Sequence, residues 1–191
     1  MPGRVTRIIR NSSELRALVS PVRQEIVDAL SSRGRMSVAE IAAAIGRRAD
    51  TLYFHVRALE KAGLARRAGV RRRGRREEAV FQTAASELKL RYTPASEANR
   101  ARVTAIVASM LRQGVRDFRR GLQQRDVGVS GPQREIWAQR WTARLTAAQL
   151  EQVNSLIVRL SQQFTGVRDT GRMYAITVVL TPLNRRPMTN E

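Results

Sequence analysis

The sequence predicts a mainly α-helical protein with one small β-hairpin and a helical C-terminal half that ends in one strand. Three observations predict this class. Three short helical patterns lie between residues 20 and 63, two strand-like segments flank an arginine run, and a long helical pattern covers residues 95–124. The 191 residues, 42% of them apolar, are enough for one domain of ordinary size or two small ones. We expect an N-terminal domain at 12–85 and a second region at 95–185.

The first helical pattern is residues 20–32, SPVRQEIVDALSS. Ser20 is a residue type that caps helices, and Pro21 takes the first helical position, where a missing N–H costs nothing. Four apolar residues then share one face: Val22, Ile26, Ala29 and Leu30. Gly34 is expected to end this helix.

Two further helices are expected on either side of Gly46. Ser37 and Glu40 are spaced as a capping box for the first of them, and Gly46 is its stop. Only three residues separate Gly46 from the next pattern, residues 50–62, whose buried face is expected to consist of Leu52, Val56 and Leu59. Two helices joined by a tight turn after a glycine form a helix-turn-helix.

The stretch GVRRRGRREEAV, residues 69–80, places five arginines around one glycine. Leu64 to Ala68 and Ala79 to Thr83 have strand character, so the arginines are expected at the tip of a hairpin that projects into solvent. Such a tip, residues 70–76, would be a wing that meets a phosphate backbone. Glu77 and Glu78 are expected at its root, paired with Arg66 or Arg67. A flexible linker is the alternative interpretation.

The segment from Ala95 to about Gln124 repeats apolar residues at three- and four-residue steps. At 1.5 Å per residue it would be a helix of about 45 Å, longer than the preceding domain can cover. A second copy of the chain is the expected cover, and the protein is therefore predicted to be a homodimer.

After the break at residues 126–132, DVGVSGP, the pattern predicts a helical stretch through Ile136, Trp137 and Trp141. Thr146 and Gln149 form a second capping box before a helix that carries Leu150, Val153, Leu156, Ile157, Leu160 and Phe164. Met173 to Thr181 predicts one buried or paired strand, stopped by Pro182.

The charge is strongly positive. The chain has 35 Lys and Arg against 16 Asp and Glu, which gives +19 and a pI of about 11.8. Such an excess attracts polyanions, nucleic acid first and an anionic membrane surface second. The excess is spread evenly, with 18 basic and 8 acidic residues before Ser86 and 17 and 8 from Ser86 onward.

The sequence argues against a metal protein, an enzyme and a secreted or membrane protein. Without cysteine, disulfides and thiolate metal sites are excluded, and a single His55 cannot make a histidine metal cluster, so no metal or cofactor is expected. No nucleophile with a base, no catalytic carboxylate pair and no phosphate-cradling glycine motif occurs, so an enzyme is not expected. The N-terminus lacks a signal-peptide core and no apolar run could span a bilayer, which predicts a cytoplasmic protein without a membrane partner.

The order of elements over about residues 12–85 resembles the winged helix-turn-helix transcription regulators of the ArsR type. The recognition-helix sequence TLYFHVRALEKAGL carries the resemblance, with its aromatic pair, a His followed by an aliphatic residue, and the ending Leu-Glu-x-Ala-Gly-Leu. The resemblance implies a bacterial homodimeric DNA-binding regulator, a repressor by expectation, with the third helix in the major groove and the wing on the adjacent backbone or minor groove. The metal ligands of the family's sensors are absent, which argues against metal control.

With Leu52, Val56 and Leu59 buried, the opposite face of the recognition helix carries Asp50, Phe54, Arg57 and Lys61, and Thr51 and Tyr53 lie at its borders. Arg57 can bond guanine bidentately, and Phe54 can meet a thymine methyl. The full set of expected DNA-binding residues is Arg47, Arg48, Thr51, Tyr53, Phe54, Arg57, Lys61, Arg71, Arg72, Arg73, Arg75 and Arg76. His55 is expected to be packed or hydrogen-bonded in the core rather than to contact a base.

Trp137 and Trp141 could form one wall of a pocket for an unidentified small-molecule effector, because residues four apart share a helical face. More often such a pair belongs to a core or a dimer interface. A non-specific architectural or RNA-associated basic protein is the alternative to the regulator, and only the net charge favours it.

Overall fold

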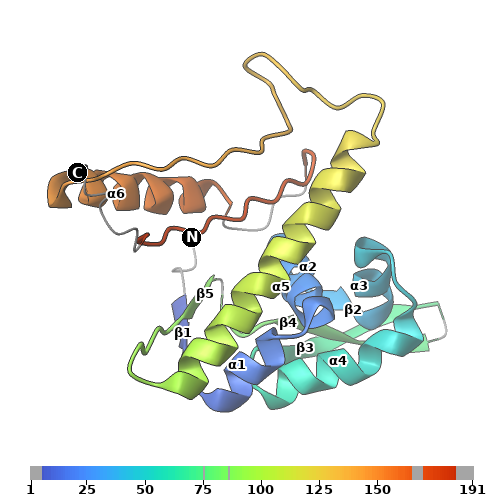
Figure 1. Ribbon diagram of the computed structural model, residues 1–191. Helices are drawn as coiled ribbons and strands as arrows, with labels where there is room; N and C mark the ends of the chain where they lie inside the picture. The colour runs from blue at the N-terminus through green and yellow to red at the C-terminus, as the bar shows by residue number, and fades with distance from the viewer. Residues whose placement is uncertain (1–5, 75, 86, 165–169, 184–191) are drawn as a thin grey trace, which may run out of the picture.

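The computed structural model describes residues 6–74, 76–85, 87–164 and 170–183. In these ranges the chain forms six helices and five strands, in the order β1, α1, α2, β2, α3, α4, β3, β4, β5, α5 and α6. Residues 6–90 make up a head of four helices and two small sheets, from which α5 rises (Figure 1). The mainly α-helical class with a hairpin is confirmed.

The helices expected in the head are present. α2 spans Pro21–Arg33, with Ser20 at the N-cap position and Pro21 inside the first turn, and Gly34 follows it at φ 79°. α3 spans Val38–Ile45, and both bonds of the predicted capping box form: Ser37 Oγ accepts from the N–H of Glu40 at 3.3 Å, and Glu40 Oε2 accepts from the N–H of Ser37 at 2.8 Å.

α4 spans Ala49–Lys61 and follows α3 after Gly46, which takes the left-handed conformation at φ 66°. Only glycine adopts this conformation without steric cost, which is why the turn comes at that residue. α4 lies along the outer edge of the head (Figure 1). The helix-turn-helix predicted from the sequence is therefore formed by α3 and α4.

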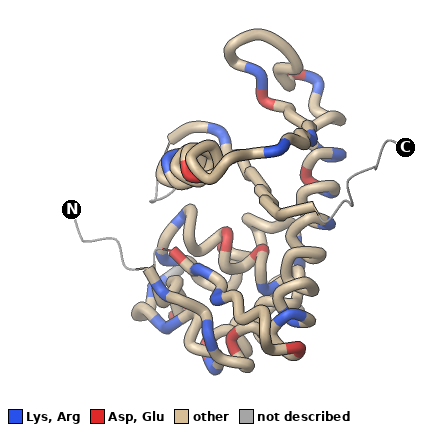
Figure 2. The backbone as a smooth tube through the Cα atoms, turned by 60° about the vertical axis from the view of Figure 1, so that its left-hand side comes forward, with Lys and Arg blue, Asp and Glu red and all other residues tan. Residues whose placement is uncertain are grey.

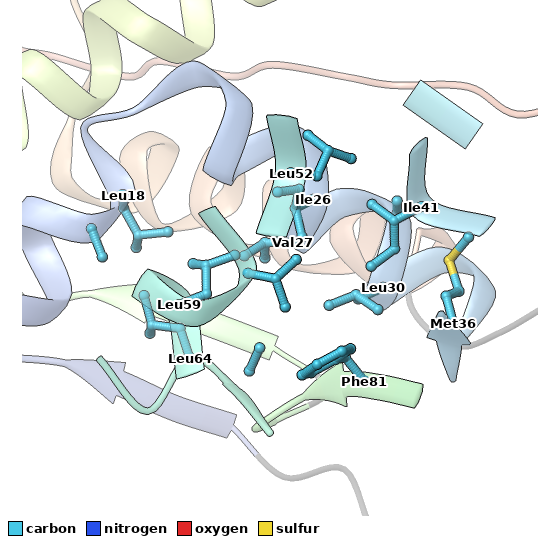
Figure 3. Close-up of a cluster of buried hydrophobic side chains, with 14 of the residues drawn as sticks. Leu18, Ile26, Val27, Leu30, Met36, Ile41, Leu52, Leu59, Leu64 and Phe81 are labelled. Carbon is cyan, nitrogen blue, oxygen red and sulfur yellow. The ribbon is translucent and has the colours of Figure 1, made fainter. Parts of the chain in front are cut away.

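The core of the head lies between α2, α3, α4 and one sheet, as Figure 3 shows. The predicted inner face of α4 is confirmed, because Leu52, Val56 and Leu59 are no more than 1% exposed. They pack in one cluster with Ile26 and Leu30 of α2. This packing fixes the rotation of α4 about its axis and so decides which of its residues face outward.

The hairpin is longer than the sequence suggests. β3 spans Ala65–Arg73 and β4 spans Arg76–Thr83, and β2, Met36–Ser37, adds to β4, so the antiparallel order is β2-β4-β3. The turn comes at Gly74, φ 61°. The expectation that all five arginines lie at the tip is wrong, because Arg71, Arg72 and Arg73 belong to β3 and Arg76 begins β4.

The pairing expected for the two glutamates is also wrong. Glu78 lies opposite Arg71 and Glu77 opposite Arg72, whereas Arg66 and Arg67 face Gln82 and Phe81. The tight turn sets this register, and an irregularity between Arg67 and Val70 then shifts it.

A second sheet and one helix were not expected from the sequence. β1, Thr6–Ile9, pairs in parallel with β5, Glu87–Leu90, and α1 spans Ser12–Leu18. The buried carboxylate of Glu14 holds this corner together, since it accepts from Arg7 Nε at 3.2 Å and from the N–H of Asn11 at 3.0 Å. Because β5 leads into α5, this sheet anchors the start of the long helix.

The long helix is confirmed as α5, Glu97–Leu122, and the helix after the second capping box as α6, Ala147–Gln163. Ile106 and Ser109 of α5 are buried against the head, and Gln24 of α2 donates to the carbonyl of Ile106 at 3.5 Å. α6, in contrast, has no buried residue within the described parts of the chain.

Two expectations for the C-terminal half are wrong. Residues 135–145 form no helix and run as a drawn-out segment (Figure 1), and residues 173–181 form no strand. A spacing of four residues, as between Trp137 and Trp141, fits an extended chain as well as a helix, because four is also a multiple of the strand period of two. For residues 173–181, no strand of the described chain lies alongside to pair with them.

Candidate nucleic-acid interface

The outward face of α4 carries large side chains in solvent. Tyr53 is 54% exposed and Phe54 is 72% exposed, and Thr51, Arg57 and Lys61 are exposed on the same helix. The opposite face is packed in the core, so these side chains cannot turn inward without breaking it. The structure thus brings together the five expected contact residues of the recognition helix on one accessible surface.

The turn before α4 carries the two arginines expected near phosphates. Arg48 has a side chain that is 83% exposed and donates to Asp50 at 2.7 Å. Thr51 Oγ1 donates to the carbonyl of Arg48 at 2.7 Å, which orders the first turn of the helix. A helix N-terminus with a neighbouring arginine is a favourable place for a phosphate.

Arg47 is less exposed than Arg48 and bonds to a residue of another helix. It donates through Nε to Glu25 of α2 at 2.8 Å, and this hydrogen bond raises the pKa of Arg47. Arg116 of α5 donates to the same carboxylate at 3.3 Å. Glu25 therefore joins the turn before the recognition helix to α5, a link that only the fold reveals because its members lie 22 and 91 residues apart in sequence.

The arginines of the wing, residues 70–76, are in different situations. Arg71 forms an ion pair with Glu40 of α3 and donates to the carbonyl of Arg35 at 3.4 Å. Arg72 is exposed. For Arg73 and Arg76 the backbone is described but the side chain is not, and Arg75 lies outside the described residues.

A groove of about 390 Å³ separates α4 from the hairpin. Its lining includes Tyr53, Arg57 and Glu60 of α4 and Arg67, Glu77 and Glu78 of the hairpin. Three carboxylates disfavour a phosphate inside this groove. Any contact with a nucleic-acid backbone is therefore expected at the outer ends of α4 and of the wing.

His55 is half-buried on the inner side of this surface. Its Nδ1 is buried without a hydrogen-bond partner in the described structure, and its ring packs edge to face with Phe54 at 5.6 Å. Burial lowers the pKa of His55, and the charges of Arg23 and Arg47 lower it further. The imidazole is therefore neutral at pH 7, and it is half-buried rather than fully buried in the core.

The two tryptophans do not share a helical face. Trp137 is 60% exposed and Trp141 is 82% exposed, both on the extended segment. The guanidinium of Arg134 lies 4.6 Å from the centre of the Trp137 ring. An effector pocket at this pair stays a prediction, and it would need another element to close it.

Positive charge is not confined to the head. Figure 2 shows Lys and Arg on the head and along α5 alike, as the even split of charge along the sequence implies. In the described ranges no group of three or more His, Cys, Asp or Glu could hold a metal ion. Nor does any helix within them have the length and apolarity needed to cross a membrane.

Comparison with known proteins bears on the head. Residues 18–68 match the family described as a helix-turn-helix domain. Among solved structures, the chain is similar to a homodimeric winged helix-turn-helix DNA-binding domain, fragment 1–100, of a possible ArsR-family transcriptional regulator from Mycobacterium bovis. The identity is 23%, the TM-score is 0.32, and the match covers 59% of this chain and 82% of that one. No curated protein matches the chain. The segment of residues 18–68 is thus a helix-turn-helix domain, which the β3–β4 hairpin completes as the winged fold that the ArsR-type resemblance implied.

Proposed function

We propose that the protein is a homodimeric transcription regulator that binds a specific DNA sequence through α4. One observation carries this proposal. Tyr53, Phe54 and Arg57 are exposed together on a helix whose opposite face is locked in the core of a helix-turn-helix domain. Large aromatic side chains are rarely left in solvent side by side without a binding role.

The chemistry of these side chains suits the major groove. Arg57 can donate to O6 and N7 of a guanine, and Phe54 can pack against a thymine methyl. Tyr53, Thr51 and Lys61 can reach base edges or phosphates, while Arg47 and Arg48 would hold phosphates at the N-terminus of α4. Base edges would supply the specificity and phosphates the orientation.

The wing would lie on the neighbouring phosphate backbone or in the minor groove. We assign this contact to Arg71, Arg72, Arg73, Arg75 and Arg76. Of these, Arg71 is held in place by its ion pair with Glu40. Each arginine that settles near a phosphate releases condensed counterions, so the contact adds affinity and salt dependence.

A homodimer would set the arrangement of the DNA site. Two α4 helices related by a two-fold axis need half-sites about 34 Å apart, one helical turn, or a multiple of it. We propose repression as the outcome, by occupation of a promoter, with an unidentified small molecule as the possible effector.

The even spread of positive charge favours a second candidate, a non-specific architectural or RNA-associated protein. Sequencing of DNA recovered with the protein from cells separates the two. Discrete promoter peaks that share a palindrome support the regulator, and uniform coverage, or recovery of RNA instead, supports the alternative. A reporter gene behind a recovered promoter then shows whether expression falls.

A further inference from the structure

The C-terminal arm, residues 134–164 and 170–183, contains the helix α6, and no other part of the described chain buries that helix. α6 has 17 residues and a capping box at Thr146, yet in the described structure none of its residues is buried. Most helical stability in proteins comes from packing of an apolar face rather than from helix propensity. The helix therefore requires another surface to pack on.

The exposed area leads to the same conclusion. The chain exposes 14802 Å². A compact monomer of 21.5 kDa would expose about 9,200 Å². The excess, about 5,600 Å² per chain, is more than the roughly 1,000 to 2,500 Å² that each partner buries in an obligate dimer.

Two helices in this region, α5 and α6, each carry an exposed stripe of apolar residues, and the two stripes have the same spacing. On α6, apolar residues recur at steps of three and four: Leu150, Val153, Ile157, Leu160 and Phe164. On the side of α5 away from the head, the same steps relate Leu111, Val115, Phe118 and Leu122. Three of the four on α5 are 46 to 59% exposed, and the ends of the α6 stripe, Leu150 and Phe164, are 42% and 47% exposed. At 1.5 Å per residue the stripes are about 17 Å and 21 Å long, so they fit side by side.

The arm contacts its own α5 through its extended segments, while α6 does not lie on that stripe. Its extended segments lie against two glycines of α5: a Cβ at Gly121 would come within 2.8 Å of Ile136 Cδ1, and one at Gly114 within 3.5 Å of Thr177 Oγ1. Arg172 donates to Glu135 at 3.0 Å and also bonds Gln124 at the end of α5. In both Figure 1 and Figure 2, α6 stands apart from α5 of the same chain.

Within the arm, α6 and residues 173–183 carry little charge. α6 carries one Glu and one Arg, and residues 173–183 carry neither acidic nor basic side chains. Two copies with a charge of +19 each repel one another, so a contact through the weakly charged α6 costs less electrostatic free energy than one through the arginine-rich head.

We propose that α6 of each chain packs against the Leu111–Leu122 stripe of a second copy, so that the two chains exchange arms. Each chain has both stripes, one on α6 and one on α5. A two-fold axis therefore lets each α6 pack on the α5 of the other chain, which gives a closed dimer. The inference rests on the homodimer of the proposed function and adds which surfaces form it.

The absence of cysteine from the sequence allows a direct test. In the double variant Val115→Cys/Leu160→Cys of the full chain, mild oxidation is expected to give a disulfide-linked dimer on a non-reducing gel. An intrachain disulfide in a monomer would overturn the exchange. Each single variant must give at least tenfold less dimer, since a strong Val115→Cys homodimer would mean that α5 pairs with α5.

Val158 gives a matched control on α6. It is 55% exposed and lies about 120° around the helix from the stripe, so Val115→Cys/Val158→Cys is expected to cross-link at least tenfold more slowly. Sedimentation provides a second test: Leu160→Glu should raise the dimer Kd about 100-fold and Val158→Glu less than threefold. Equal effects would overturn the arm contact. If the wild-type dimer and a palindromic footprint persist in that case, only this inference fails and the proposed function stands.

Discussion

Arg47, in the turn before the recognition helix, donates to Glu25 of α2 at 2.8 Å, and the same carboxylate also accepts from Arg116 of α5 at 3.3 Å. The Glu25 side chain is only 14% exposed, so both arginines share a partly desolvated anion. The position of the α4 N-terminus is thereby coupled to the helix on which we propose that dimerisation occurs.

Replacing Glu25 with Gln should lower the free energy of unfolding by about 1 to 2 kcal/mol, because charge-assisted bonds to two arginines become neutral ones. Urea unfolding measures this. Glu60→Gln, an exposed carboxylate on α4, is the control and should change stability by less than about 0.5 kcal/mol. Equal losses in the two variants would show that Glu25 is not a structural link.

A pH-dependent prediction concerns Asp28. Burial of its carboxylate raises its pKa to about 6, with the charges of Asp117 and Glu25 acting in the same direction and the bond from Gln113 opposing them. A raised pKa means that the folded protein binds a proton between pH 6 and about 4 that the unfolded chain does not bind, so this group lowers stability above pH 6.

Asp28→Asn should therefore stabilise the protein at pH 8, and the gain should disappear as the pH falls from 6 to 4. Solvent still reaches part of Asp28 and screens its charge, so we expect a gain of about 1 kcal/mol rather than the full shift. Thermal unfolding of both proteins at pH 8, 6 and 4 tests this. A constant difference across that range would contradict the assignment.

Arg57→Ala should weaken binding to the cognate operator by about 1 to 3 kcal/mol and relax the preference at one base pair in each half-site. Gel-shift or fluorescence titrations against operators substituted one base pair at a time measure both effects. If Arg57→Ala reduced binding to operator and random DNA equally, α4 would not be reading bases.

For the wing, replacing Arg71, Arg72, Arg73, Arg75 and Arg76 with Ala should lower the slope of log affinity against log salt. If two or three of them contact phosphates in each subunit, the expected change is about 4 to 5 per dimer. Operator and random DNA should lose affinity by similar factors, because phosphates carry no sequence information. An unchanged slope would mean that the wing does not touch DNA.

The sequence predicts the head well where local signals decide the structure. Ser37 with Glu40 and the glycine at position 46 mark α3 from both ends, and Leu52, Val56 and Leu59 set the rotation of α4. β1 was missed because its parallel partner lies about 80 residues away and no turn signal marks the pair. The link through Glu25 could not be predicted either, because its two arginine partners lie 22 and 91 residues away in the sequence.

In the arm, the apolar pattern alone led to wrong expectations. The spacing of Trp137 and Trp141 does not distinguish a helix from an extended chain, and residues 173–181 have strand-forming composition without a strand beside them in the described chain. Both segments lie against α5 of the same chain, at Gly121 and Gly114, and no local sequence signal marks these contacts. Their structure therefore cannot be inferred from local sequence.

The central claim is that the outward face of α4 reads a DNA sequence. The most direct measurement is the ratio of affinities for a duplex recovered from cells and for its scrambled version, at one fixed salt concentration near 150 mM. A sequence-specific regulator predicts a ratio of about 1,000 or more. A ratio near one, with tight salt-dependent binding to both duplexes, would contradict the claim and identify a non-specific basic protein.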